Sequence, residues 1–396
     1  MKSRLMSQID KVILIIWSVF LTQEFFADVS TINTSSLQWA EMLSKLLCLL
    51  LVACCLIKLI YHRNTLFEYV IPGSMILLFL VIRSFVDGYF SGYLLILVVA
   101  MYGIEFERIA KIYLIVVGSC LLITSLFSIL GIVGMSISDG GRFTEYRYAF
   151  GTAHPNGLGC IVLLLFCCLI YLFYTTEKIL YVIWAEILNF ALFSVIQSMS
   201  FFGIVTIGLA VCLIEFISRK YGFSNHILMR IIRVMIMLAP LLIVMACFGC
   251  ALYIHIFGTQ SPAGVMGTLQ SRINFIGQAF EKYPVKLFGT DIPYVSLSLR
   301  EIYQGDIFLL DNGWMTILFS EGIVEFIVYF GILQISSIRA FRNKSYSVCI
   351  LILMFSMEMF MENFLTSFVY GLIWLTLFAS FKSGRGKVSG FKNEEK

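Results

Sequence analysis

The chain has 396 residues, of which 60% are hydrophobic and only 13% charged, and its mean hydropathy is +0.92. A soluble domain carries about 25% charged residues, so this composition excludes an ordinary soluble globular protein. The formal net charge of +4 is too small to indicate nucleic-acid binding. All 11 cysteines fall within long apolar stretches, so we expect neither a disulfide framework nor a metal site.

Twelve apolar stretches follow one another, most of them close to the roughly 20 residues that a helix needs to cross the hydrocarbon. Continuous apolar runs exclude the alternating pattern of a membrane barrel. The sequence therefore predicts an all-α, polytopic membrane bundle in one transmembrane domain, 1–396. The predicted spans lie near 11–27, 40–60, 67–84, 88–104, 110–133, 157–174, 179–196, 200–218, 232–255, 314–338, 346–361 and 364–381.

Lys and Arg gather on alternate connections between these spans. If the N-terminus is inside, roughly 20 of the 28 Lys and Arg residues lie on the cytoplasmic side, as the positive-inside rule requires. Both termini are then cytoplasmic, and 382–396 is a basic cytoplasmic tail. The last two predicted spans could form one long helix, but the charge pattern favours a turn at Glu362-Asn363.

This topology places two long loops, 134–156 and 256–313, on the outer face. Loops of that length are usually functional or folded. In the second loop, Leu269, Ile273, Ile276 and Phe280 recur at helical spacing. We therefore expect an amphipathic helix near 269–282 that lies on the membrane surface or caps the bundle.

The first outer loop leads into the sixth span through His154-Pro155-Asn156-Gly157. Pro155 suits a helix start and Asn156 can cap one. Because the N–H groups of a first helical turn bind anions, this turn is a candidate phosphate site beside His154. An ordinary capped helix with a solvated histidine explains the residues equally well.

Three outer arginines, Arg142, Arg147 and Arg272, have the guanidinium geometry that suits a pyrophosphate. Anchoring to lipid headgroups is the alternative for each of them. The short outer turn that ends at Ser200 is either a sugar-contacting edge or a plain turn.

Four further polar residues lie at the outer ends of late spans. Asp311 and Asn312 precede the tenth span, where they either cap the helix or supply a base for a sugar hydroxyl. Glu358 and Glu362 are four residues apart and share one helical face. Carboxylates so close to hydrocarbon are costly and often functional, although near a span end they can reach water. Deeper carboxylates, Glu186, Glu321 and Glu325, would suit a transporter's proton relay.

Taken in order, these motifs resemble those of bacterial O-antigen and capsular or exopolysaccharide polymerases of the Wzy type. The resemblance rests on Gly151 to Asn156, on Arg272 followed by Tyr283-Pro-Val-Lys-Leu-Phe-Gly289, on Asp311-Asn312-Gly-Trp, and on the turn from Glu358 to Asn363. The matches are scattered between positions 140 and 365. An arginine usual near the 194–200 turn is replaced here by Phe201 or Phe202.

The resemblance implies a GT-C-like glycosyltransferase of the bacterial cytoplasmic membrane that needs no cofactor. It would join oligosaccharide repeat units carried on undecaprenyl pyrophosphate, at the outer face, and work with a flippase and a chain-length regulator. The implied pyrophosphate ligands are Arg142, Arg147, Arg272, Asn156 and Gly157. His154 is the first choice for the base and Asp311 the second, while Asn312, Glu358 and Glu362 would position substrate or a basic partner.

Three other functions remain open at the level of sequence. A ligase-like transferase shares the overall plan and would move finished glycan onto a different acceptor. A lipid-oligosaccharide transporter would have midplane sites, broken helices and often internal repeats, and the chain has no such repeat. A membrane scaffold has little use for a long outer loop ordered around arginines.

Overall fold

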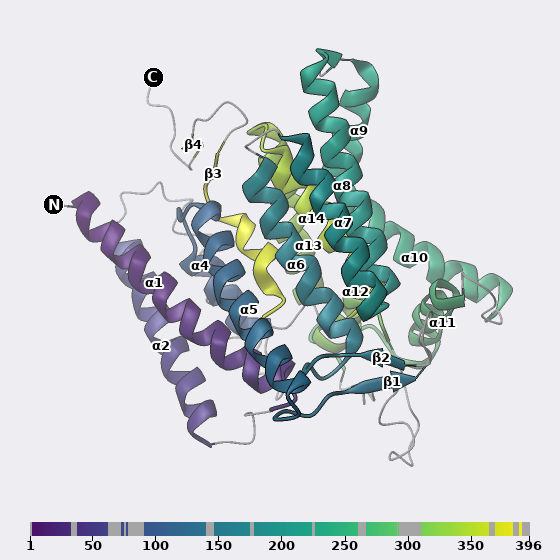
Figure 1. Ribbon diagram of the computed structural model, residues 1–396, viewed down its shortest axis with the longest axis horizontal. Helices are drawn as coiled ribbons and strands as arrows, with labels where there is room; N and C mark the ends of the chain where they lie inside the picture. The colour runs from purple at the N-terminus through teal and green to yellow at the C-terminus, as the bar shows by residue number, and fades with distance from the viewer. Residues whose placement is uncertain are drawn as a thin grey trace.

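The computed structural model describes residues 2–32, 38–61, 73–74, 77, 91–139, 146–174, 178–223, 226–259, 267–290, 292, 310–363, 369–382 and 388–389. Across these ranges the chain is helical, apart from two small two-stranded sheets. Figure 1 shows the helices packed as one bundle, with α10 and α11 projecting from one side. The all-α class predicted from the sequence is confirmed.

The elements follow in chain order. The first half contains α1 (Lys2–Glu24), the π-helix η1 (Phe25–Val29), α2 (Gln38–Tyr61), α4 (Ser91–Ala100), α5 (Phe106–Ile129), β1 (Ile137–Asp139), β2 (Tyr146–Tyr148), α6 (Pro155–Tyr174) and α7 (Ile179–Ile196). The second half contains α8 (Met199–Lys220), α9 (Ile227–Met237), α10 (Ala239–Phe257), α11 (Gly267–Lys282), α12 (Gly313–Thr316), the π-helix η6 (Ile317–Glu321), α13 (Ile323–Arg342), α14 (Tyr346–Met361), the 3-10 helix η8 (Gly371–Leu377), β3 (Phe381–Lys382) and β4 (Val388–Ser389).

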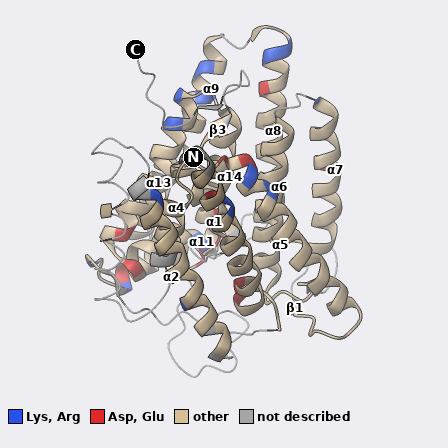
Figure 2. Cartoon of the chain, turned by 90° about the vertical axis from the view of Figure 1, so that its left-hand side faces the viewer, with Lys and Arg blue, Asp and Glu red and all other residues tan. Residues whose placement is uncertain are grey.

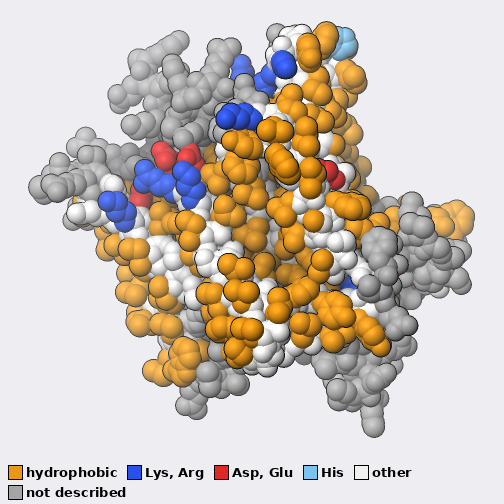
Figure 3. Space-filling model, in the orientation of Figure 1, with side chains coloured by type: hydrophobic (Ala, Val, Ile, Leu, Met, Phe, Trp, Pro, Cys, Tyr) orange, Lys and Arg blue, Asp and Glu red, His pale blue; other side chains and the backbone are white. Residues whose placement is uncertain are grey.

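Seven helices among the described residues are long and apolar enough to cross a membrane, which fits a multi-pass membrane protein. They are Leu5–Val29, Phe106–Ile129, Pro155–Tyr174, Ile179–Ile196, Met199–Lys220, Ala239–Phe257 and Ile323–Arg342. Hydrophobic side chains cover most of the visible helical surface (Figure 3). Of these seven helices α6 is the most buried, with 78% of its most apolar part inside the structure, against 17% for α7, most of whose side chains are exposed or half-buried.

Four of the predicted spans differ from the helices that form, among them those predicted at 232–255 and 88–104. The span predicted at 232–255 is divided into α9 and α10, which meet at Leu238. Pro240 follows directly, and because proline has no N–H it cannot continue the hydrogen-bond ladder of α9. The span predicted at 88–104 contains only the ten-residue α4. The span predicted at 67–84 lies outside the described residues except for 73–74 and 77.

The span predicted at 314–338 is broken at Gly322, where φ is +96°. The segment 286–290 of the second outer loop fills the break. Carbonyls of Lys286 and Leu287 accept the N–H groups of Ile323 and Val324 at 3.0 and 3.2 Å, and so complete the start of α13. The sequence pattern alone predicts one continuous helix here, because the segment that breaks it comes from a remote part of the chain.

The chain reverses direction after α14, at the turn predicted from the charge pattern. Glu362 lies at the start of α6, whereas Ser380 pairs with Glu105 at the opposite end of the bundle. The returning segment is not the span-length helix predicted at 364–381, because its described part, 369–382, contains only the seven-residue η8. All of η8 is buried, and non-helical backbone is tolerated at membrane depth where protein rather than lipid surrounds it.

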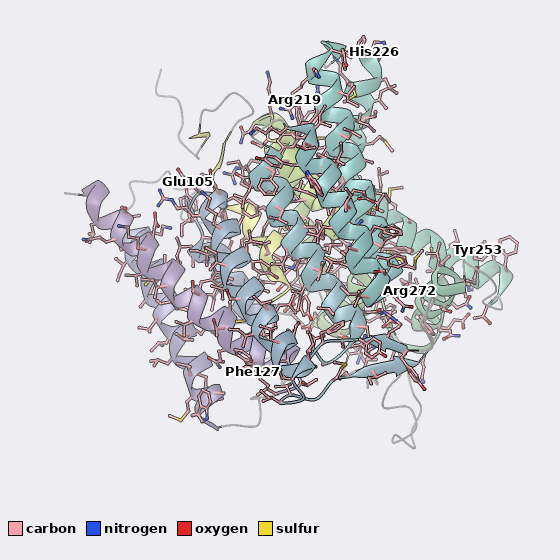
Figure 4. The ribbon with its side chains drawn as sticks, in the orientation of Figure 1. Glu105, Phe127, Arg219, His226, Tyr253 and Arg272 are labelled. Atoms are coloured by element: carbon pink, nitrogen blue, oxygen red, sulfur yellow. The ribbon has the colours of Figure 1, made fainter. Side chains whose placement is uncertain are left out.

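The two ends of the bundle differ in charge. In Figure 2, the positions of Lys and Arg residues, coloured blue on the ribbon, gather around α9 and the adjoining end of α8. Figure 4 shows His226 at this basic end and Arg272 toward the other. The end that holds Arg272 is the one that the sequence predicts to face outward.

Candidate functional site

Four segments from three remote parts of the sequence meet at the end of the bundle that holds Arg272. They are the β1–β2 hairpin of the first outer loop, the start of α6, α11 of the second outer loop, and the end of α14. Ser138 pairs with Arg147 in the hairpin, which lies beneath the start of α6 in Figure 1. The predicted site residues of these segments are therefore neighbours in space.

His154 caps α6. Its Nδ1 accepts the backbone N–H of Asn156 at 3.1 Å, which is the geometry of a side-chain N-cap. Burial, with the positive charge of Arg147 adding to it, lowers the pKa of His154 to about 4. The imidazole is therefore neutral near pH 7, and because Nδ1 accepts a hydrogen bond, its proton is on Nε2.

This cap occupies one of the N–H groups that the sequence offers to a phosphate at the first turn of α6. The N–H of Asn156 is bonded to His154 and is not available to a phosphate. His226 caps α9 in the same way at the basic end of the bundle, where its Nδ1 accepts the N–H of Leu228 at 3.3 Å. The start of α6 is thus a capped helix, and His154 supplies the cap.

A chain of polar contacts connects two arginines through an amide and a carboxylate. Arg147 Nη2 donates to Asn156 Oδ1 at 2.6 Å, and Asn156 Nδ2 donates to Glu362 Oε1 at 3.0 Å. The same Glu362 oxygen accepts Arg272 Nη2 at 2.7 Å. Asn156, expected to cap α6 or to bind pyrophosphate, joins the two arginines instead. We call these four residues the arginine network.

The arginine network is nearly closed to solvent on the side of α11. Arg272 is 6% exposed and Glu362 is 1% exposed. Arg272 Nε also donates to the carbonyl of Met361, and Ser200 Oγ donates to Glu362 Oε1 at 3.5 Å. Removing one partner of a buried ion pair costs about 3–5 kcal/mol. Arg272 therefore fixes α11 against the end of α14.

A second contact between α6 and α14 lies one helical turn deeper. Cys160 Sγ donates to Glu358 Oε1 at 3.2 Å, and Glu358 Oε2 has no hydrogen-bond partner among the described residues. Cys160 follows Asn156 by four residues and Glu358 precedes Glu362 by four, so both pairs share one interhelical seam. Sequence reasoning missed Cys160, although its spacing from Asn156 was a signal.

Asn312 serves as a helix cap, one of the two interpretations that the sequence allows. Its Oδ1 accepts the N–H of Met315 at 2.9 Å, and its Nδ2 donates to the carbonyl of Phe360 at 2.9 Å. Asp311 is half-buried beside the network. Burial raises the pKa of Asp311, while the charge of Arg272 lowers it.

Burial also raises the pKa of Glu362, and Arg272 opposes this effect. A carboxyl group with a raised pKa is a stronger base than an ordinary one when it is ionised. Of the two carboxyl groups, Asp311 is the more accessible to a substrate, since Glu362 is enclosed by its partners.

The absence of a side chain at Gly157 lets another part of the protein approach it closely. A Cβ at this position would lie 3.1 Å from the hydroxyl of Tyr370, which the returning segment brings to the start of α6. The end of the first span lies against the same loop, where Ala153 N–H donates to the carbonyl of Val29 at 2.8 Å. Both neighbours were missed, because nothing in the local sequence indicates them.

The remaining candidates that the structure describes lie apart from the network. Arg142 falls outside the described residues. Glu186 accepts hydrogen bonds from Asn189 at 3.3 Å and Thr206 at 2.7 Å. Glu325 is buried in α13, and Glu321 ends η6. The structure thus gathers the outer candidates into one site and leaves the candidate carboxylates of a proton relay in separate places.

Comparison with known proteins identifies no relative of this chain, so the site is interpreted from its own chemistry. No family model, curated protein or solved structure matches the chain.

Proposed function

We propose that this protein is a polysaccharide polymerase of the bacterial cytoplasmic membrane, which joins oligosaccharide repeat units carried on undecaprenyl pyrophosphate at the outer face. The proposal includes a GT-C-like arrangement of about twelve spans, both termini in the cytoplasm, and a flippase and a chain-length regulator as partners. It rests on the resemblance described above and on the arginine network.

The arginine network is the single observation that supports this proposal best. Two arginines, an amide and a glutamate from four segments meet beside Glu358 and Asp311 at one end of the bundle. Charged groups near hydrocarbon are expensive, and buried ion pairs contribute little net stability. A cluster of this kind is therefore better explained by substrate chemistry than by folding.

The chemistry of the transfer assigns each residue a role. The hydroxyl oxygen of the acceptor sugar attacks the anomeric carbon of the donor while the bond to pyrophosphate breaks and its electrons pass to the pyrophosphate. Arg147 and Arg272 stabilise that developing charge. Asp311 accepts the proton of the hydroxyl, and His154, a neutral donor through Nε2, orients the acceptor. The base is thus assigned to Asp311 rather than to His154.

The decisive experiment compares the lipid-linked glycans of a deletion strain that carries either Arg272→Lys or Arg233→Lys. Arg233 is the matched control, because it forms a buried pair with Glu215 at 2.6 and 2.9 Å at the basic end of the bundle. Lysine cannot reproduce bidentate guanidinium bonds. We expect Arg272→Lys to accumulate single repeat units and Arg233→Lys to make polymer.

The same glycan profile separates the alternative functions. Long carrier-linked chains in the deletion strain would indicate a ligase-like transferase and overturn the polymerase. The break at Gly322 favours a lipid-oligosaccharide transporter, since transporters use discontinuous helices. Single units retained on the cytoplasmic face would establish that function instead.

A further inference from the structure

A groove opens between α6, α7 and α8 at the basic end of the bundle, away from the arginine network. About 330 Å³ of space in and above it is not filled by protein atoms, and part of that space is open to the surroundings, so this is a shallow surface groove and not an enclosed cavity. Its walls are apolar, and α7 contributes Tyr181, Val182 and Ala185 while α8 contributes Leu209 and Cys212. Small side chains at Ala185 and Cys212 leave the space open.

The groove has the length and direction of part of an acyl chain. From Lys178 to Ala185 the wall runs along seven residues of α7, or about 10 Å of helix. This is about a third of a hydrocarbon core roughly 30 Å thick, measured from one membrane surface. Phe173 in the wall of the groove is 38% exposed, so a lipid chain can enter the groove from the outside of the bundle without crossing protein.

Positive charge lies at the surface end of the groove. Lys178 lines it, with Nζ 5.5 Å from the centre of the Tyr181 ring. Arg219 lies 4.5 Å over the ring of Tyr174, another lining residue, and Lys220 is next in the last turn of α8. Two aromatic rings thus hold cations where an apolar groove meets the membrane surface.

Among the described residues, little acidic charge opposes these cations. Glu215 lies 3.9 Å from Arg219, but both of its oxygens are bonded to Arg233. Glu177 precedes Lys178 in the sequence and lies outside the described residues. Basic pockets between membrane helices on the cytoplasmic side bind anionic headgroups.

We propose that this groove is a binding site for an anionic phospholipid of the basic-side leaflet. One acyl chain lies between α7 and α8, and the headgroup phosphate contacts Lys178 and the end of α8. The site is separate from the proposed transferase chemistry and does not depend on it.

The test uses the purified full-length protein in detergent, titrated with phosphatidylglycerol or with phosphatidylethanolamine of the same acyl chains, and bound lipid is counted by native mass spectrometry. We expect tighter binding of phosphatidylglycerol. The variant K178Q/K220Q should lose most of this preference, by roughly fivefold for each lysine removed. K111Q is the matched control, because Lys111 is a lysine of the same end that pairs with Glu107 at 2.7 Å.

A second variant tests separately whether the acyl chain of the lipid lies in the groove. Ala185→Phe fills the groove and should lower the binding of both lipids while the thermal unfolding temperature stays near that of the wild type. Equal binding of the two lipids by the wild type, or an unchanged preference in K178Q/K220Q, would overturn the proposal. If the folded Ala185→Phe protein binds both lipids as well as the wild type does, the acyl chain does not lie in the groove, and the proposal is overturned.

Discussion

At the scale of single residues, His154 has two roles, as the cap of α6 and as the proposed Nε2 hydrogen-bond donor, and one substitution can separate them. Asparagine is a good N-cap, so His154→Asn should keep α6 stable, whereas His154→Ala should cost about 1 kcal/mol. Asparagine does not reproduce the Nε2 donor, so both variants should form polymer at least tenfold more slowly (about 1.4 kcal/mol in the barrier). Thermal unfolding and glycan size profiles measure the two effects.

His226→Asn is the control for this experiment, because His226 caps α9 with the same Nδ1 bond at the other end of the bundle. It should leave both stability and polymer unchanged. Normal polymer from the His154→Asn protein would reduce His154 to a cap and remove it from the proposed site.

The environment of His154 also predicts a pH dependence of stability. Its pKa is about 4 in the folded protein, against an ordinary 6.5. Between these values the unfolded chain binds a proton that the folded chain excludes, so stability falls as pH is lowered through this window. From about pH 7 to about pH 5 the loss is at most about 2 kcal/mol, and less after solvent screening.

His154→Asn isolates this contribution, since asparagine does not titrate. The unfolding temperature of the wild type should fall more than that of the variant as the pH is lowered. Parallel curves for the two proteins would show that His154 ionises in the folded state much as it does in the unfolded chain.

At the scale of elements, the crossing of Gly289 and Gly322 determines how the second outer loop meets α13. A Cβ on Gly289 would lie 1.8 Å from the carbonyl oxygen of Ser320, and one on Gly322 would lie 2.4 Å from the backbone nitrogen of Gly289. Both residues also have positive φ, +81° and +96°. Gly289→Ala and Gly322→Ala should therefore each destabilise the protein by about 1–3 kcal/mol or more.

Gly331→Ala is the matched control within α13, because a Cβ there meets nothing within 4 Å. It should be neutral, or stabilising by about 0.5–1 kcal/mol, since alanine favours helix more than glycine does. Thermal unfolding of the three purified variants measures the differences. Equal stabilities would mean that the loop segment 286–290 does not fill the break.

The helices and their breaks differ in how well the sequence predicts them. Apolar runs locate α6, α7 and α8 well, because each is one uninterrupted helix of 18 to 22 residues that is apolar over most of its length. They miss the break at Gly322 and the 3-10 geometry of η8, since both depend on which remote segment supplies hydrogen bonds. The site follows the same rule: residue types indicate Arg147, Arg272 and Glu362, whereas the Asn156 bridge and Cys160 require the packing of α6 on α14.

At the scale of the whole molecule, the positions of the two ends relative to the membrane decide whether the proposed chemistry is possible. The arginine network must face the side on which repeat units are polymerised, and the basic end must face the cytoplasm. The charge pattern predicts this orientation. Thus one topological experiment bears on both proposed sites, because the lipid groove belongs to the opposite leaflet.

Tyr146 and Tyr221 form a matched pair for that experiment, because both are exposed tyrosines, at 45% and 63%, on opposite ends of the bundle. The 11 native cysteines are free and buried or half-buried in helices, so a membrane-impermeant maleimide should label them little. In intact cells, once the outer membrane is made permeable, Tyr146→Cys should be labelled at once. Tyr221→Cys should react only after the cytoplasmic membrane is opened. The reverse pattern would place the arginine network in the cytoplasm, where neither the polymerase nor its assigned residues could act as proposed.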